Sequence, residues 1–215
     1  MVLVTFEQLI VFVKLNTDLI LETCQKNEET KIDLFHTYKQ FIGDHGEILD
    51  AQILTANENL LALATNNEFI KIYDMNTWNC RLLKGHNDLV ISLAVFTNRN
   101  NNSGILVDYL ASSSKDSTIR LWKISTNTNN EYEYECVSVG LGHTQDVGAL
   151  AFSKQNLEFL VSGSIDTTIK MWQISKDTLS VKYTMKAHEK DINSISISSN
   201  DKLIASGSSD KTLKV

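Results

Sequence analysis

Histidine, serine and aspartate residues recur along this chain in a fixed order, and together such residues could form the nucleophilic triad of a hydrolase. In that chemistry a histidine removes the proton of a serine hydroxyl while an aspartate orients the imidazole ring. The three sets are His86, Ser114 and Asp116; His143, Ser164 and Asp166; and His188, Ser208 and Asp210. A catalytic set is needed only once, in surroundings of its own. Its repetition therefore favours a structural role.

The residues around these sets repeat as well. Each histidine is followed four residues later by an apolar residue, and an aromatic residue, Trp122 or Trp172, lies six residues after Asp116 and Asp166. Short apolar runs between these markers alternate with polar residues, which is typical of half-buried strands. No segment shows a sustained helical period. The sequence thus predicts units of about four strands, at about 43–83, 84–140, 141–185 and 186–215.

Composition limits the kinds of function that need to be considered. The 215 residues include 20 Lys and Arg against 26 Asp and Glu, a formal net charge of -6, which argues against direct binding in a nucleic-acid groove. No apolar run approaches the roughly 20 residues needed to cross a bilayer. Cys24, Cys80 and Cys136 are dispersed, which favours reduced thiols over a disulfide framework or a zinc site. No motif for a catalytic site, metal, cofactor or small-molecule substrate is present.

A unit of about 40–45 residues with Gly-His early and a tryptophan late resembles the WD-repeat (WD40) family. Gly-His at 85–86 and 142–143, and the tryptophans at 122 and 172, carry this resemblance. It implies an all-β fold, a WD40-type β-propeller of four-stranded antiparallel blades. The chain would hold an incomplete propeller of about four blades over 43–215. Residues 1–42 would supply closing strands of a preceding blade or propeller and a connector.

The resemblance also implies how the repeated residues are used. In this family a loop histidine bonds the aspartate of a tight turn, and a strand hydroxyl and the tryptophan indole continue the network. The residues that match are His86, Ser114, Asp116, Trp122, His143, Ser164, Asp166, Trp172, His188, Ser208 and Asp210. The first unit offers Asn67 and Tyr73 at the corresponding positions and His45 is followed, not preceded, by glycine. We therefore expect the first blade to be the loosest.

The segment AHEKDIN at 187–193 is the most specific part of a further resemblance, to the WD-repeat subunits of the small-subunit processome. This resemblance implies a non-catalytic scaffold in nucleolar pre-rRNA processing and small ribosomal subunit biogenesis. Its partners would be proteins of a large ribonucleoprotein assembly. Pre-ribosomal RNA or small nucleolar RNA would be reached indirectly, with no membrane involved. Members of that group have further blades and a helical C-terminal domain, so we expect this chain to be part of a longer protein.

Two alternatives remain open. One is an unrelated WD-repeat adaptor of the signalling or ubiquitin-ligase type, and the other is an enzyme with a propeller body. The loop residues Asn87, Gln145, Glu189 and Lys190 are candidate partner contacts, although solvated loop residues would have the same character. A unique polar cluster outside the repeat would favour an enzyme.

Overall fold

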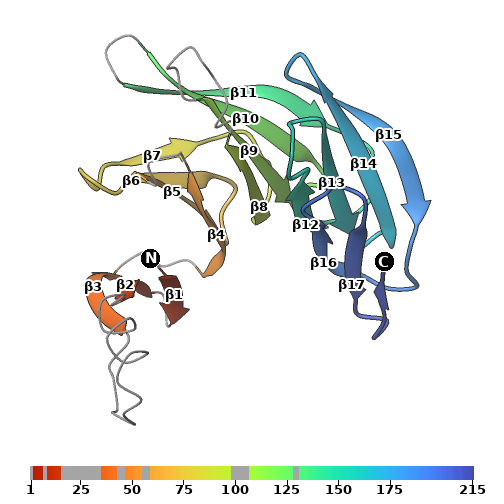
Figure 1. The fold of residues 1–215 in the computed structure, drawn as a ribbon, viewed down its shortest axis with the longest axis horizontal. Coiled ribbons are helices and arrows are strands. Elements are labelled where there is room, and N and C mark those ends of the chain that lie inside the picture. Colours follow the sequence, from red (N-terminus) through yellow and green to blue (C-terminus); the bar gives the residue numbers. More distant parts are fainter. Residues whose placement is uncertain are drawn as a thin grey trace. The chain divides into compact units, whose positions relative to one another are not determined.

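A computed structural model describes residues 2–6, 9–15, 35–42, 47–54, 59–97, 107–127 and 131–215 of the chain. Every regular element in these residues is a β-strand (Figure 1). The chain divides into two compact units, Met1–Ile48 and Leu49–Val215. No helix within the described residues is long and apolar enough to cross a membrane. Residues named above that lie outside the description are Cys24 and His45.

The first unit contains one antiparallel sheet of three strands. Its strands, in the order β1-β2-β3, are Val2–Phe6, Leu9–Leu15 and Phe35–Ile42. The strands β2 and β3 pair with a register shift between Phe12 and Val13. That this sheet closes a preceding blade or propeller stays a prediction.

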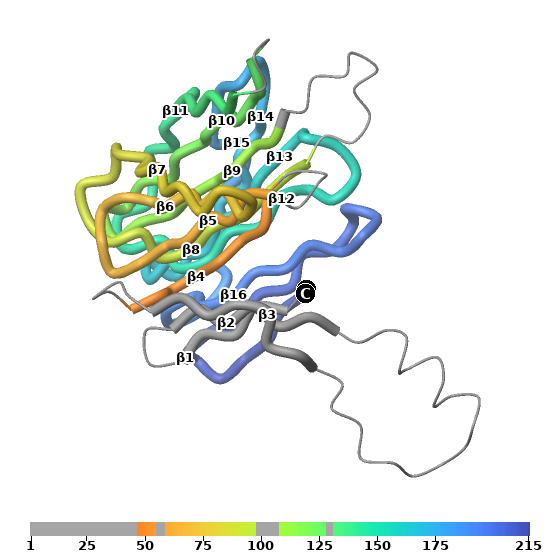
Figure 2. The backbone as a smooth tube through the Cα atoms, turned by 90° about the vertical axis from the view of Figure 1, so that its left-hand side faces the viewer, coloured from red at the N-terminus to blue at the C-terminus, as the bar shows by residue number. Residues whose placement is uncertain are grey.

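The second unit contains four antiparallel sheets in chain order, and they form four blades of a β-propeller (Figures 1 and 2). Within each blade, consecutive strands are neighbours, so the sheets are simple meanders. The first blade has β4 (Ile48–Leu54), β5 (Leu60–Thr65), β6 (Ile70–Asp74) and β7 (Cys80–Leu83). The second has β8 (Val90–Thr97), β9 (Val107–Ser114), β10 (Ile119–Thr126) and β11 (Tyr132–Gly140). The third has β12 (Val147–Phe152), β13 (Phe159–Ser164), β14 (Thr168–Ser175) and β15 (Thr178–Lys186). The fourth has β16 (Ile192–Ile197), β17 (Ile204–Ser208) and β18 (Leu213–Lys214). The predicted all-β propeller fold is confirmed.

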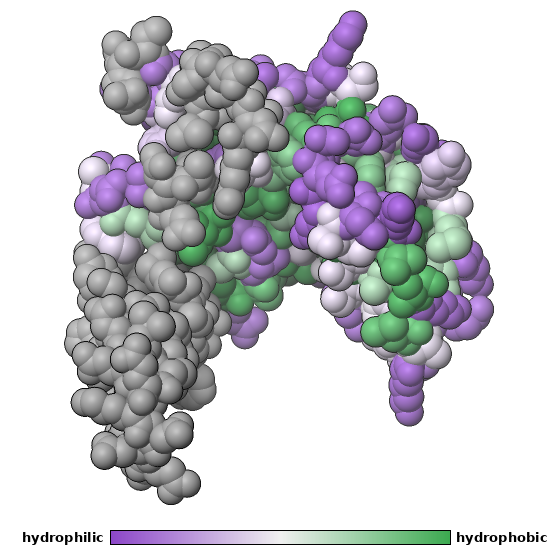
Figure 3. All heavy atoms as spheres, viewed as in Figure 1, coloured by the Kyte–Doolittle hydropathy of each residue, from purple (hydrophilic) through white to green (hydrophobic). Residues whose placement is uncertain are grey.

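Burial follows the position of each strand in its blade. All six residues of β5 are buried, and this strand contacts β8 of the next blade. The outer strand β15 is the opposite case, with eight of its nine positions exposed. Figure 3 shows hydrophobic residues in the centre of the second unit and hydrophilic residues over its outer loops and strands.

The core lies between the sheets in three separate clusters. The first joins the first two blades and contains Trp122, and the second joins the second and third blades and contains Trp172. The third cluster has no aromatic residue among its fully buried members and centres on Ile192, Ile195 and Val161. Burial of each large side chain contributes roughly 1.5–3 kcal/mol, so these clusters supply most of the cohesion between blades.

An aspartate crosses each junction between neighbouring blades and accepts two hydrogen bonds from the adjoining sheet. Asp50 accepts from the Leu93 N–H (2.7 Å) and the Ser92 hydroxyl (3.1 Å), Asp177 from the Tyr109 hydroxyl (2.6 Å) and Lys123 Nζ (2.7 Å), and Asp201 from the N–H groups of Lys154 (2.6 Å) and Gln155 (3.0 Å). These carboxylates bond each blade to its neighbour. None of them belongs to the repeated motif, and sequence analysis did not find them.

A glycine in the third blade tests how tightly the blades pack. A Cβ atom at Gly163 would lie 2.5 Å from Ile192 Cγ2 and 2.8 Å from Ile195 Cδ1, both in the fourth blade. The equivalent Gly207 has only Ser194 Cβ near, at 3.9 Å. We predict that Gly163→Ala lowers the free energy of unfolding by about 1–3 kcal/mol through overpacking.

The matched control is Gly207→Ala, which removes the same backbone freedom in a strand and meets no neighbour closely. It should leave stability unchanged or raise it by up to about 1 kcal/mol. Urea denaturation of both variants measures the difference. Equal effects of the two substitutions would contradict the packing described here.

Candidate functional site

The repeated aspartates lie in the tight turns between the second and third strands of their blades. The residue after each aspartate adopts a left-handed backbone conformation, with φ of 65° at Ser117, 69° at Thr167 and 69° at Lys211. Such a conformation is unfavourable for residues other than glycine. In each turn the aspartate Oδ1 accepts hydrogen bonds from the N–H and hydroxyl of the threonine two positions later, at 2.9 and 2.7 Å for Asp116 and Thr118. These bonds hold the turn closed.

The histidines meet the same carboxylates from the loops that connect one blade to the next. Nδ1 lies 3.0 Å from Asp116 Oδ2 for His86, 2.8 Å from Asp166 Oδ2 for His143 and 2.9 Å from Asp210 Oδ2 for His188. The backbone N–H of the following residue donates to the same oxygen in all three blades. Each aspartate therefore ties the loop that enters a blade to a turn inside that blade.

A buried serine on the second strand completes the network. Ser112 Oγ lies 2.8 Å from His86 Nε2 and accepts the indole N–H of Trp122 at 2.9 Å. Ser162 makes the same contacts with His143 and Trp172, both at 2.8 Å. In the fourth blade Ser206 Oγ lies 2.9 Å from His188 Nε2.

The serines expected in this position, Ser114, Ser164 and Ser208, have a different role, so that assignment is corrected. Each accepts the N–H of the aspartate two positions later and donates to a carbonyl in the histidine loop. These hydrogen bonds join the loop to the turn, while the serines two positions earlier bond the histidine. A hydroxyl recurs four residues before each aspartate as regularly as two residues before it. That recurrence was the available signal.

Burial and hydrogen bonding set the charge states of this network. Burial raises the pKa of Asp116, but the hydrogen bonds from the Asn87 and Thr118 N–H groups, the Thr118 hydroxyl and His86 outweigh it and bring the pKa to about 2. Asp166 also has a pKa of about 2, for the same balance of burial against hydrogen bonds from Thr168 and His143. The Thr212 hydroxyl, opposed by desolvation, leads the hydrogen bonds that lower the pKa of Asp210.

Burial lowers the pKa of His86 and His143, more than their aspartate partners raise it. Both rings are therefore neutral at pH 7. An ionised carboxylate can only accept, so Nδ1 carries the ring proton and Nε2 accepts the serine hydroxyl proton. The resulting chain of donors runs from the tryptophan indole through the serine to the histidine, which in turn donates to the aspartate.

These contacts match the connectivity of a hydrolytic triad, but their surroundings do not suit catalysis. Ser112 and Ser162 have no exposed surface. Each serine oxygen already accepts an indole N–H, which occupies one of its two lone pairs. The same arrangement occurs in two blades and, without the tryptophan, in a third. The network stabilises the blades, since each buried partner left unpaired would cost about 1–3 kcal/mol.

The first blade is built differently. Leu63, 2% exposed, occupies the position of the histidine-bonding serine, so a buried apolar side chain replaces the hydroxyl. Asn67 bonds within its turn, through Nδ2 to the Thr65 hydroxyl at 3.4 Å and its N–H to the Thr65 carbonyl at 2.6 Å. The backbone of Asn67 also accepts the Val90 N–H of the next blade. The expectation that this blade is the loosest stays a prediction.

The four candidate partner contacts, Asn87, Gln145, Glu189 and Lys190, all have exposed side chains. Their backbones belong to the network: the N–H groups of Asn87 and Glu189 donate to the aspartates, and the carbonyls of Gln145 and Lys190 accept from serines. The loops are thus rigidly held while their side chains face solvent. Such an arrangement suits recognition, because the loop backbones lose little conformational entropy on binding.

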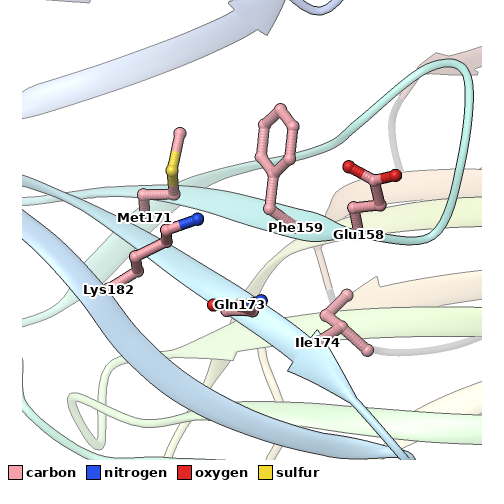
Figure 4. Close-up of a pocket in the computed structure, with 6 residues that line it drawn as sticks. All are labelled: Glu158, Phe159, Met171, Gln173, Ile174 and Lys182. Atoms are coloured by element: carbon pink, nitrogen blue, oxygen red, sulfur yellow. The ribbon is translucent and has the colours of Figure 1, made fainter.

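A shallow groove of about 130 Å³ lies on the third blade, away from the network. Figure 4 shows its lining side chains: Glu158, Phe159, Met171, Gln173, Ile174 and Lys182. It brings together one carboxylate and one ammonium group and contains no histidine, serine or cysteine. Among the described residues, no cluster of three or more histidine, cysteine or acidic side chains could hold a metal ion.

The network and the blades define the class of protein. The family model of the WD domain, G-beta repeat, matches residues 78–123, 134–173 and 179–215, more than half of the chain. The chain belongs to the WD-repeat family. Each matched segment begins near the outer strand of one blade and ends at the third strand of the next, so a sequence repeat spans two blades. The strands β4 to β6 lie outside the matched residues.

Curated relatives resemble the chain beyond the repeat itself. Transducin beta-like protein 3 of Rattus norvegicus is 38% identical over 190 residues, 82% of this chain and 22% of that protein. The Homo sapiens protein of the same name is 36% identical over the same shares. U3 small nucleolar RNA-associated protein 13 of Saccharomyces cerevisiae is 32% identical over an alignment that covers 100% of this chain and 26% of that protein. The chain thus spans about a quarter of the length of these relatives.

The turn aspartate offers a direct test of the network. Asp166→Ala removes the acceptor of His143 Nδ1, of the Thr144 N–H and of Thr168. We predict a loss of about 1–3 kcal/mol in the free energy of unfolding. Asn67→Ala, at the matching position of the first blade, should cost less than about 0.5 kcal/mol. Thermal melts of both variants measure the effects, and equal losses would contradict the assignment.

The pKa shifts predict a stability that falls in two steps on acidification. His86 and His143 bind protons less readily in the folded chain than at their ordinary pKa of 6.5, so stability is full above pH 6.5 and declines below it. Asp116 and Asp166, with folded pKa values of about 2 against an ordinary 3.8, add a second decline that starts near pH 3.8 and ends near pH 2. Urea denaturation across this range tests the order of the steps. Stability that rises on acidification through pH 6.5 would contradict neutral buried histidines.

Proposed function

We propose that this chain acts as a non-catalytic scaffold in the small-subunit processome, in nucleolar pre-rRNA processing and small ribosomal subunit biogenesis. The observation that carries the proposal is the similarity of the whole chain to a protein named for its association with U3 small nucleolar RNA. The relatives named transducin beta-like protein 3 support it over a shared 82% of the chain. The same similarity supports a location in the nucleolus.

The geometry supports a scaffold because the polar groups of the network hydrogen-bond to one another inside the blades. The histidines, serines and aspartates that could do chemistry are buried and bonded to one another in three blades. What remains for partners is a set of rigid, exposed loops and outer strands. A net charge of -6 favours protein partners, with pre-ribosomal or small nucleolar RNA reached through them.

The proposed contacts are Asn87, Gln145, Glu189 and Lys190, which lie in equivalent loops of three blades. A second candidate function, a WD-repeat adaptor in signalling or ubiquitin ligation, would use the same kind of loops. No feature of the described residues favours it over the processome.

The proposal predicts which molecules accompany the chain in cells. A tagged chain, isolated from nuclear extract, should enrich U3 small nucleolar RNA and processome proteins over a spliceosomal RNA used as a reference. The proteins should remain after ribonuclease treatment, because the contacts are made through protein. Replacing Asn87, Gln145 and Lys190 together by alanine should reduce this enrichment and leave the thermal melt unchanged, since only exposed side chains are removed.

Asp166→Ala serves as the comparison, because it lowers stability without altering these side chains. Enrichment of ubiquitin-ligase subunits or signalling proteins in place of U3 RNA would overturn the proposal. Loss of the processome proteins together with U3 RNA after ribonuclease treatment would also overturn it.

A further inference from the structure

The outer strand β15 has the same length as the outer strand β11, but it is more exposed and carries lysines, whereas β11 carries glutamates. The strand β15 is the last strand of its sheet, so among the described residues one of its edges has no neighbouring strand. Nine residues make up the strand, whereas β7 has four. An unpaired edge presents backbone N–H and C=O groups that can accept another extended chain.

Apolar side chains line this strand on both faces. Val181, Tyr183 and Met185 are 43%, 63% and 58% exposed. Val181 pairs with Trp172 and so shares the face that looks toward the second blade. Tyr183 pairs with Met171 and shares the opposite face.

Lysines interleave with these apolar residues and have few internal partners. Lys182 Nζ lies 5.8 Å from the ring centroid of Tyr183. Figure 4 places Lys182 on β15 beside Met171. Lys186 Nζ lies 3.8 Å from Glu189, but both side chains are largely exposed, which makes that ion pair weak. Lys176, just before the strand, is also exposed. A basic edge thus occurs in a chain whose overall charge is negative.

We propose that the free edge of β15 binds an extended, acidic peptide segment of a partner protein by strand addition. Backbone hydrogen bonds to β15 would align the peptide. Its acidic side chains would meet Lys182 and Lys186, and its apolar side chains would cover Val181 and Tyr183. This is the common mode in which an exposed sheet edge recognises a peptide. The inference rests on the proposed scaffold function and names one surface for it.

A peptide fits this surface better than single-stranded RNA does. The neighbouring outer strand β11 carries three exposed glutamates, Glu131, Glu133 and Glu135, at and just before its start. Its far end contacts β15 through the Leu179 N–H, which donates to Ser138 Oγ at 2.9 Å. A polyanion that continued along this rim would meet those glutamates, whereas a short acidic peptide ends before them. Tyr183 is also the one aromatic side chain in β15, and RNA platforms usually stack several bases.

Binding of a short fluorescein-labelled peptide in which glutamate alternates with valine and threonine, followed by anisotropy, tests the proposal on the whole chain. We expect saturable binding that weakens by about tenfold or more in a Lys182→Glu, Lys186→Glu variant. The matched control is Lys154→Glu, Lys202→Glu, which makes the same change in charge at exposed loop positions and should bind within about twofold of the unaltered chain.

Two further probes separate strand addition from simple charge attraction. A peptide N-methylated at one set of alternate residues should lose binding, and one methylated at the other set should keep it, because only alternate N–H groups face β15. This readout does not depend on any variant of the protein folding. Equal binding of both methylated peptides would overturn the proposal.

Other results would also overturn it. Absence of peptide binding, or an equal loss of affinity in both double-lysine variants, would contradict the assignment of the binding surface to β15. Tighter binding of oligouridine that displaces the peptide would assign the surface to RNA. Self-association of the chain that depends on Glu133 and Glu135 would assign it to β11 of a second copy. Failure of peptide binding with U3 RNA still enriched in cells would leave the proposed function standing, so the two can fail separately.

Discussion

The ionised aspartate in each tight turn is the interaction on which the repeated architecture depends. Its two oxygens accept four hydrogen bonds, from a histidine ring, two backbone N–H groups and a threonine hydroxyl. These bonds offset the left-handed backbone of the next residue and the burial of the carboxylate. Burial keeps the rings of His86 and His143 neutral although the aspartates raise their pKa, and the one ring proton is donated to the carboxylate. The serine and tryptophan then have defined partners.

This arrangement matters at the loop where each sequence repeat passes from one blade to the next. Each repeat supplies the outer strand of one sheet and the inner strands of the next, so the connecting loop must be held in a fixed direction. The histidine at the end of that loop bonds the turn of the blade it enters. Apolar clusters and the aspartates Asp50, Asp177 and Asp201 then join the sheet faces. Polar bonds set the geometry, and apolar packing supplies most of the free energy.

The sequence was sufficient for the fold and for the histidines, aspartates and tryptophans of the network. Recurrence identified the histidines, the turn aspartates and the tryptophans, because their spacing is set by short turns within one sheet. The bonding serine was missed, because two hydroxyls on the same strand face, Ser112 and Ser114, recur equally well and only coordinates separate their partners. The aspartates between blades occur once each, so no period marks them. Whether a strand such as β15 lies at the edge of its sheet depends on its neighbours in the folded chain, and no pattern along the sequence indicates this.

A double-mutant cycle on His143 and Asp166 tests the central claim most directly. The free energies of unfolding of the two single alanine variants and of the double variant give the coupling between the side chains. A structural brace predicts that the two losses are not additive, with a coupling of about 1 kcal/mol or more. Additive losses, with a coupling indistinguishable from zero, would show that the imidazole and the carboxylate do not support one another and would contradict the account.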